Sequence, residues 1–183
     1  MTEDLTICDA SIDDAAAIAE LYAHYVLKST ATFETEPPDA AEIARRMSDI
    51  TNAGYPFLVT RDSAGRVLAV GFAYRYGPRV GYRYSVETTI YVQPDCIGNG
   101  IGGRLLTALV AACEAHGFRQ AFAVIAASEP ASVVLHARAG YRPVGTLAGA
   151  GWKHGQWIDV FLMQRQLGTG NETLPKEDSA NGT

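Results

Sequence analysis

A glycine-rich segment between a β-like run and a helical pattern constrains this chain more than any other feature. Residues 97–103 read I-G-N-G-I-G-G. The apolar residues that follow at helical spacing are Leu105, Leu106, Leu109, Val110 and Cys113. Glycine allows successive backbone N–H groups to turn toward one point, and a following helix adds the positive end of its dipole. The segment therefore predicts a strand, a cradle for phosphate groups and a helix, in that order.

Other glycine-rich phosphate sites fit this segment less well. A Rossmann dinucleotide site needs an acidic residue at the end of the next strand, whereas the next β-like run here ends A-V-I-A-A-S. A Walker A loop needs Gly-Lys followed by Ser or Thr, which this segment lacks. A glycine turn that only packs a helix against a sheet remains the simple alternative.

Length and composition predict one α/β domain over residues 1–167, followed by a polar tail, 168–183, that we expect to be disordered. The chain has 183 residues, 48% of them hydrophobic, and a formal charge of −5, which argues against nucleic acid or an anionic membrane as partner. Neither an 18-residue apolar run nor a signal-peptide pattern is present, so we expect a cytoplasmic protein. Three widely spaced cysteines predict reduced thiols and no metal site.

Periodicity and turn signals predict an alternation of helices and strands. The predicted helices are residues 11–27, a segment opened by Asp39, the segment after the glycines, and 130–139 with Val133, Val134 and Ala137 facing inward. The predicted strands are 57–60 and 67–76 as a hairpin, 83–93 before the glycines, 119–126, and a closing pair, 141–152 and 157–166.

Two spaced motifs resemble the GNAT superfamily of N-acetyltransferases. Residues 97–102 align with its Q/R-x-x-G-x-G/A motif after a strand that ends I-Y-V, and residues 129–141, E-P-A-S-V-V-L-H-A-R-A-G-Y, are similar to a later motif. Three further segments resemble the phosphinothricin and methionine sulfoximine acetyltransferase branch. They are T-A-T-F-E-T-E-P-P (30–38), Y-R-Y-S-V-E (82–87) and G-W-K-H-G-Q-W-I-D-V-F-L-M-Q-R (151–165).

The resemblance implies a GNAT fold, with a central mixed, largely antiparallel twisted sheet that splays at the acetyl-CoA site and carries helices on both faces. It also implies direct acetyl transfer from acetyl-CoA to a primary amine, no metal, and a homodimer. In this family a bulge separates the strand before the glycines from its neighbour. The implied cofactor contacts are backbone groups of Ile90, Tyr91 and Val92, the amides of Gly98, Asn99, Gly100, Ile101, Gly102 and Gly103, and the side chain of Glu129.

Three residues depart from the pattern that the resemblance implies. Ile97 replaces Arg or Gln, and Asn99 stands where this branch often has Arg, so the loop carries less positive charge, which Arg104 partly offsets. Glu129 replaces an Asn that contacts the pantetheine arm in the family, and a carboxylate offers no N–H donor. We expect weaker binding of the cofactor as a result.

Two residues match the branch at catalytic positions. Glu87 corresponds to the glutamate of the branch's V-E pair and is our candidate base for the acceptor's ammonium group, acting through water. His136 stands where many family members have the tyrosine that protonates the thiolate, and its pKa range suits proton donation or acceptance. Without the resemblance, the pattern favours a structural role for both residues.

The acceptor site is predicted from arginines and from the branch motifs. Arg75 and Arg83 flank the loop before the Glu87 strand, and their guanidinium groups suit an α-carboxylate, although both also fit solvated strand ends. Phe33 and Glu34 resemble the branch's substrate loop. The remaining candidate substrate residues lie on the two predicted strands, 67–76 and 83–93. They are Tyr76, Ser85, Val86 and Glu87. Trp152 and Trp157 either shape the pocket wall or only staple the last hairpin.

The sequence thus predicts an acetyl-CoA-dependent N-acetyltransferase for a small amino acid or analogue, of the phosphinothricin, methionine sulfoximine or methionine sulfone type. One alternative is a different amine acceptor, such as a polyamine or an aminoglycoside, which would favour an acidic cleft. Another is a CoA-binding module with little catalysis, which the departures at Ile97, Asn99 and Glu129 keep open.

Overall fold

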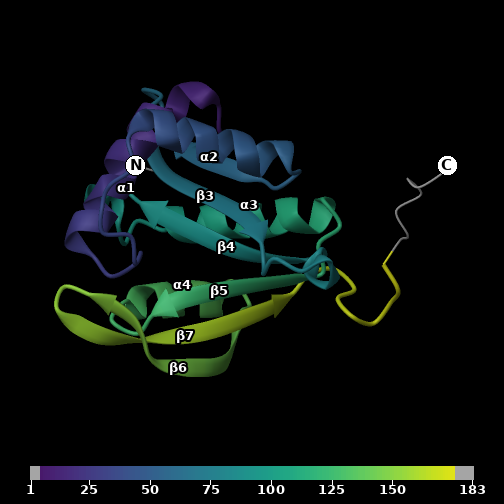
Figure 1. The fold of residues 1–183 in the computed structure, drawn as a ribbon. Coiled ribbons are helices and arrows are strands. Elements are labelled where there is room, and N and C mark those ends of the chain that lie inside the picture. Colours follow the sequence, from purple (N-terminus) through teal and green to yellow (C-terminus); the bar gives the residue numbers. More distant parts are fainter. Residues whose placement is uncertain (1–4, 176–183) are drawn as a thin grey trace.

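The structure, a computed structural model, describes residues 5–175, in which the strands form a single sheet that is flanked by helices (Figure 1). The strands are β1 (Thr6–Asp9), β2 (Phe57–Arg61), β3 (Val67–Arg75), β4 (Ser85–Val92), β5 (Gln120–Ala126), β6 (Arg142–Lys153) and β7 (Gln156–Gln166). The α-helices are α1 (Ala15–Lys28), α2 (Ala40–Asn52), α3 (Ile101–Ala115) and α4 (Pro130–Arg138). Short 3-10 turns occupy Ile12–Asp14, Val80–Tyr82 and Pro94–Cys96.

The sheet has the strand order β1-β2-β3-β4-β5-β7-β6. Strands β4 and β5 are parallel and are joined through α3, whereas all the other neighbouring strands are antiparallel. Helices α1 and α2 lie on one face of the sheet, and α3 and α4 lie on the other (Figure 1). The mixed, largely antiparallel sheet with two helical layers that the resemblance implies is therefore confirmed.

Alternation along the strands produces two cores. Phe57 and Val59 on β2 pack with α1 and α2, whereas Leu58 between them packs under α3. The α3 core contains Leu105, Leu106 and Leu109, all fully buried. The helical spacing that follows the glycines therefore marks the buried face of α3, as the sequence predicts.

The helix that Asp39 opens is confirmed with its cap. The Asp39 side chain accepts a hydrogen bond from the Glu42 backbone N–H at 2.8 Å, which satisfies one of the free N–H groups in the first turn of α2. The predicted hairpin is also confirmed, as β2 and β3 pair antiparallel from Phe57–Phe72 onward.

Two local predictions were wrong or incomplete. The sequence did not predict β1, a four-residue edge strand too short for a clear alternation. On α4, Val134 is 51% exposed and Ala137 is also exposed, because His136 takes the buried position on that helix. Only Val133 of the three residues expected to face inward packs against the core.

Two further features concern the chain outside the sheet. Residues 168–175, the first part of the predicted tail, form turns in which the Arg119 guanidinium contacts Thr169 and Thr173, while 176–183 lie outside the described residues. Between residues 5 and 175, no helix is long and apolar enough to cross a membrane.

Candidate active site

The central sheet opens between β4 and β5. These strands pair only at Ser85–Gln120, Val86–Ala121 and Glu87–Phe122. Beyond this point β4 continues beside β3 to Val92, and β5 continues beside β7 to Ala126, so the two halves of the sheet separate (Figure 1). The β3–β4 ladder stays in unbroken register from Arg75–Val86 to Ala69–Val92. The expected splay is present, therefore, but it arises where β4–β5 pairing ends, without the bulge we expected.

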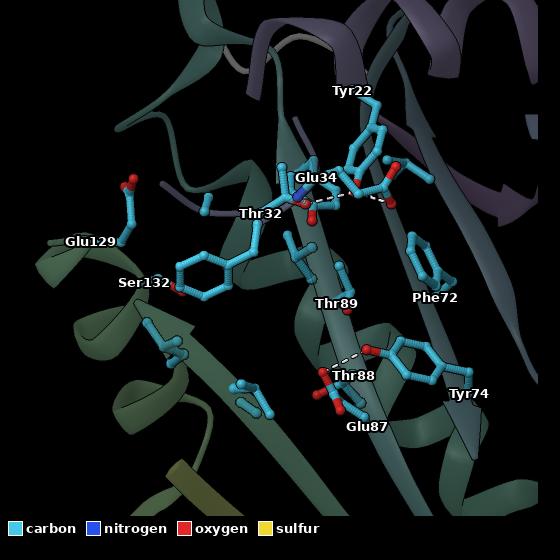
Figure 2. Close-up of a pocket in the computed structure, with 18 of the residues that line it drawn as sticks. Tyr22, Thr32, Glu34, Phe72, Tyr74, Glu87, Thr88, Thr89, Glu129 and Ser132 are labelled. Carbon is cyan, nitrogen blue, oxygen red and sulfur yellow. Dashed lines mark hydrogen bonds between the residues drawn. The ribbon is translucent and has the colours of Figure 1, made fainter. Parts of the chain in front are cut away.

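A pocket of about 390 Å³ lies at the start of the splay, between β4, β5, α4 and the segment after α1. It brings together seven of the predicted site residues, which come from three separate parts of the chain. These are Phe33, Glu34, Glu87, Ile90, Tyr91, Glu129 and His136. Figure 2 shows Glu129 and Ser132 on one side of this pocket and Tyr22 and Phe72 on the other.

Glu87 lies in this pocket with one strong partner. The Tyr74 hydroxyl, directly across the β3–β4 ladder, donates a hydrogen bond to Glu87 Oε1 at 2.5 Å (Figure 2). Burial raises the pKa of Glu87 above its ordinary value, and the Tyr74 hydrogen bond opposes that rise. Burial and the neighbouring carboxylate also raise the pKa of Tyr74, so its hydroxyl remains a donor. Glu87 is thus a carboxylate poised to accept a proton.

His136 is 4% exposed and lines the same pocket. Its Nδ1 lies 2.8 Å from the Ser132 carbonyl oxygen, which can only accept, so Nδ1 carries the hydrogen of the neutral ring. Its Nε2 is buried and has no hydrogen-bond partner among residues 5–175. Burial lowers the pKa of His136, with the Ser132 hydrogen bond opposing the change. The ring is therefore a neutral imidazole with a free proton-accepting nitrogen.

The residues after α1 form one wall of the pocket. Glu34 accepts hydrogen bonds from the Tyr22 hydroxyl at 2.9 Å and from the Arg46 guanidinium at 2.7 Å. The Phe33 ring lies against Gly151 of β6, where a Cβ atom would come within 2.0 Å of Phe33 Cε1. The position of Phe33 therefore requires glycine at residue 151.

The glycine segment forms the predicted turn into α3. Gly98 and Gly100 have φ values of 88° and 78°, a left-handed conformation that favours glycine. Helix α3 begins at Ile101, and its first internal backbone bond runs from Arg104 N–H to Gly100 O, so the N–H groups of 101–103 have no helical acceptor. A Cβ on Gly102 would lie 3.2 Å from Val92 Cγ2, so the helix start sits directly against β4. This geometry fits a phosphate cradle.

Two of the predicted cofactor contacts already have protein partners. The Tyr25 hydroxyl donates to the Val92 carbonyl oxygen at 2.5 Å. The Glu129 carboxylate accepts hydrogen bonds from Ser29 and Thr30 at 2.7–3.1 Å. The backbone group of Val92 and the side chain of Glu129 are thus committed to the segment around the end of α1.

Several predicted acceptor residues lie outside this pocket. Arg83 lines a separate surface depression with Arg119, and its guanidinium lies 4.7 Å from the centre of the Tyr84 ring. The Tyr76 ring stacks on Phe122 at 4.1 Å. Val86 is fully buried under α3, on the opposite face of β4 from Glu87. Arg75 and Ser85 sit at the paired ends of β3 and β4, and the buried Arg75 Nε has no hydrogen-bond partner in the described part of the chain.

Four polar residues around the pocket were not predicted from the sequence. They are Tyr22, Arg46, Tyr74 and Lys153. The register of the β3–β4 pair contained the signal for Tyr74, because it stands opposite Glu87. The others contact the site through tertiary packing, for which local periodicity gives no signal. No group of three His, Cys, Asp or Glu side chains able to hold a metal ion occurs within 5–175.

Comparison with known proteins agrees with this geometry. Residues 8–162 match the model of the acetyltransferase (GNAT) domain family. The chain therefore belongs to the GNAT acetyltransferases, the family expected from the motifs. It is 43% identical over 165 residues to a phosphinothricin N-acetyltransferase of Alcaligenes faecalis, a match that covers 90% of this chain and 83% of the relative.

Two further relatives lie in the same branch. An L-methionine sulfoximine/L-methionine sulfone acetyltransferase of Pseudomonas aeruginosa is 35% identical, with 88% of this chain and 94% of the relative covered. The crystal structure of a phosphinothricin acetyltransferase of Sinorhizobium meliloti in complex with acetyl-CoA superposes with a TM-score of 0.93 at 43% identity. That match covers 95% of this chain and 94% of the other. The predicted branch is confirmed.

The Tyr74–Glu87 hydrogen bond yields the first testable prediction. In Tyr74→Phe the pKa of Glu87 should rise above its wild-type value, because the substitution removes the contact that opposes the effect of burial. Carboxyl-carbon NMR titration measures this shift, with Glu87→Gln used to assign the signal. Tyr82→Phe, on the loop before β4, is the matched control and should leave the titration unchanged. An unaltered Glu87 pKa in Tyr74→Phe would contradict the assigned role of this hydrogen bond.

Proposed function

We propose that this protein transfers the acetyl group of acetyl-CoA to the primary amine of a small amino acid or analogue of the phosphinothricin, methionine sulfoximine or methionine sulfone type. The observation that supports this most strongly is the placement of Glu87 and His136 in one pocket at the splay of β4 and β5. Identities of 43% and 35% to enzymes acting on such acceptors support the substrate class.

The residues of the splay and the glycine turn fit acetyl-CoA. The N–H groups of 101–103 and the left-handed turn at Gly98 and Gly100 suit its pyrophosphate, and the unpaired edge of β4 around Ile90 and Tyr91 suits its amide-bearing arm. Ile97 is 60% exposed and Asn99 is exposed, so the binding rests on backbone groups with little side-chain charge. When bound, acetyl-CoA supplies an activated thioester.

Glu87 acts in this proposal as the base. An ammonium group cannot attack a thioester, so the acceptor must lose a proton, and a carboxylate with a raised pKa in the pocket can accept it directly or through water. The amine nitrogen can then form the new bond to the acetyl carbon and release a second proton, while the carbon–sulfur bond breaks and CoA leaves as a thiolate that takes up a proton from solvent.

The surroundings of His136 favour a role as a second proton acceptor. Its Nε2 carries no hydrogen in the tautomer that the Ser132 contact fixes, and burial keeps the ring neutral at physiological pH. A neutral ring in this tautomer offers no N–H from Nε2 to a thiolate. Of the two roles expected for His136, acceptance therefore agrees better with its surroundings than donation.

An arginine is proposed to bind the acceptor's carboxylate. Arg75 and Arg83 were the candidates from the sequence, and Arg46 is the arginine that lines the pocket, where it pairs with Glu34. A guanidinium binds a carboxylate through two parallel hydrogen bonds, whereas a polyamine or aminoglycoside has no such group. An arginine that makes this contact would therefore favour amino acids over polycationic acceptors.

A thiol-release assay with acetyl-CoA tests the proposed function. We expect turnover with phosphinothricin, methionine sulfoximine and methionine sulfone, and at least about ten-fold lower kcat/KM with the corresponding amines that lack the carboxylate, since ion-paired hydrogen bonds are worth roughly 1.5–3 kcal/mol. Faster turnover with spermidine or an aminoglycoside would reassign the acceptor. Binding of CoA without turnover on any amine would indicate a binding module.

Single-arginine variants in the same assay locate the carboxylate contact. The contacting arginine is the one whose replacement by Ala raises KM for the amino acid while leaving KM for the decarboxylated amine unchanged. Arg46→Ala, Arg75→Ala and Arg83→Ala test the three candidates, and Arg45→Ala, on the exposed side of α2, is the control. Equal effects on both acceptors in every variant would exclude an arginine clamp.

Removal of the Glu87 carboxylate tests its role as base. Glu87→Gln should lower kcat about 10²- to 10⁴-fold at neutral pH and regain activity as the pH rises through the acceptor's ammonium pKa. The raised pKa of Glu87 should place the acidic limb of the wild-type profile above the ordinary range of a glutamate, because only the ionised form accepts the proton. Glu20→Gln, on α1, is the matched control. A variant profile that parallels the wild type would remove Glu87 from this role.

We also propose a homodimer in the cytoplasm, as expected for this branch. Apolar side chains stay exposed on the β6–β7 hairpin, where Val144, Leu147, Trp152 and Trp157 are 48–70% exposed. The two tryptophan rings lie 5.0 Å apart across the hairpin and outside the pocket, so they staple the hairpin. Light scattering should give twice the chain mass, and a charged substitution at Trp157 should halve it. A monomeric wild type would contradict the proposal, and cell fractionation tests the location.

A further inference from the structure

Glu129 makes an unusual set of contacts for a residue at the start of a helix. It is the N-cap of α4, yet its side chain makes no capping hydrogen bond to that helix. Its Oε1 instead accepts hydrogen bonds from Ser29 Oγ at 2.7 Å, Thr30 N–H at 3.1 Å and Thr30 Oγ1 at 2.9 Å. These donors are about 100 residues away in sequence. The carboxylate thus joins α4, beside β5, to the segment that follows α1.

A second polar contact reaches the same segment from the end of β6. Lys153 is 4% exposed, and its Nζ donates to the Thr32 carbonyl oxygen at 2.6 Å and to the Tyr25 carbonyl oxygen at 3.3 Å. Burial lowers the pKa of Lys153, while the charges of Glu129 and Glu34 raise it. A charge buried this deeply needs an opposite charge nearby, and Glu129 is one of the two that supply it.

Both contacts cross the splay. Segment 29–34 begins at the end of α1, which packs on the β3 and β4 half of the sheet, whereas Glu129 and Lys153 belong to the β5–β7–β6 half. Phe33 and Glu34, which line the pocket, follow the tethered residues directly. The contacts to Ser29, Thr30 and Thr32 therefore determine where this pocket wall lies.

We propose that Glu129 is a positioning residue that holds segment 29–34 across the splay, with Lys153 as its second anchor, and thereby fixes the acceptor wall formed by Phe33 and Glu34. A carboxylate suits this position because all three groups that face it are donors, and an ionised acceptor strengthens each bond. The kinetic part of this inference rests on the proposed acetyl transfer, whereas the structural part stands on the contacts alone.

Hydrogen–deuterium exchange of segment 29–34 tests the structural part without reference to activity. In Glu129→Ala the Thr30 amide should exchange at least about ten-fold faster than in wild type, since it loses a charged acceptor. Glu129→Gln should remain close to wild type, because its amide oxygen still accepts. Glu114→Ala, which deletes a carboxylate on α3, is the matched control and should leave the exchange of segment 29–34 unchanged.

Steady-state kinetics with acetyl-CoA and methionine sulfone tests the positioning role. Glu129→Ala and Lys153→Met should raise KM for methionine sulfone at least about ten-fold and change KM for acetyl-CoA less than about two-fold. Glu129→Gln should restore most of the loss, which a general loss of stability would not predict. Should Glu129→Ala fail to fold, Ser29→Ala combined with Thr30→Val removes two of the three donors from the other side and should raise the same KM.

Two results would overturn the inference. A changed KM for acetyl-CoA with unchanged KM for methionine sulfone and unchanged exchange would place Glu129 on the cofactor. Wild-type exchange in Glu129→Ala would show that the contacts do not hold the segment. A wild-type enzyme that acetylates no amine would refute the proposed function, and the exchange experiment would still decide whether Glu129 holds segment 29–34.

Discussion

The limited pairing of β4 with β5 is the constraint on which the rest of the structure depends. Three residue pairs join the two halves of the sheet, from Ser85–Gln120 to Glu87–Phe122, and every site feature lies at or beyond the last of them. Where the sheet separates, backbone groups of β4 have no strand partner. When buried, such groups need hydrogen bonds from a ligand, water or side chains. The Tyr25 hydroxyl meets this requirement at Val92. The pocket and the tether at Glu129 follow from the same opening.

The chemistry of the pocket comes from burial more than from charge pairs. Burial raises the pKa of Glu87 and lowers the pKa of His136, because it disfavours the charged form of each side chain. A hydrogen bond opposes each shift. Glu87 accepts one from the Tyr74 hydroxyl, and His136 donates one to the Ser132 carbonyl oxygen. An ionised Glu87, made more basic by its raised pKa, and a neutral His136 line one cavity, and both can accept a proton from an ammonium group, the step the proposed reaction requires.

Much of the fold was predictable because it depends on local patterns. The Asp39 cap, the β2–β3 hairpin and the apolar spacing after the glycines each involve neighbours in sequence. Glu87 and His136 were found through motif resemblance, and the structure places both in the pocket. Tyr74, Arg46 and Lys153 were missed because their contacts join distant segments, as in the 121-residue separation of Lys153 from Thr32. Burial of His136 in place of Val134 likewise depends on tertiary packing.

The absence of a side chain at Gly151 has a consequence for how this pocket can change. Because the Phe33 ring fills the space that a Cβ would occupy, the loop residue and the strand residue form one unit, although 118 positions separate them. Substitutions at the two sites should not act independently, since a smaller residue at 33 would relieve the clash that any larger residue at 151 creates. A side chain at 151 therefore requires the Phe33 ring to move or to be replaced by a smaller group. The shape of this wall thus depends on a contact between one ring and the backbone of β6, outside the reacting groups.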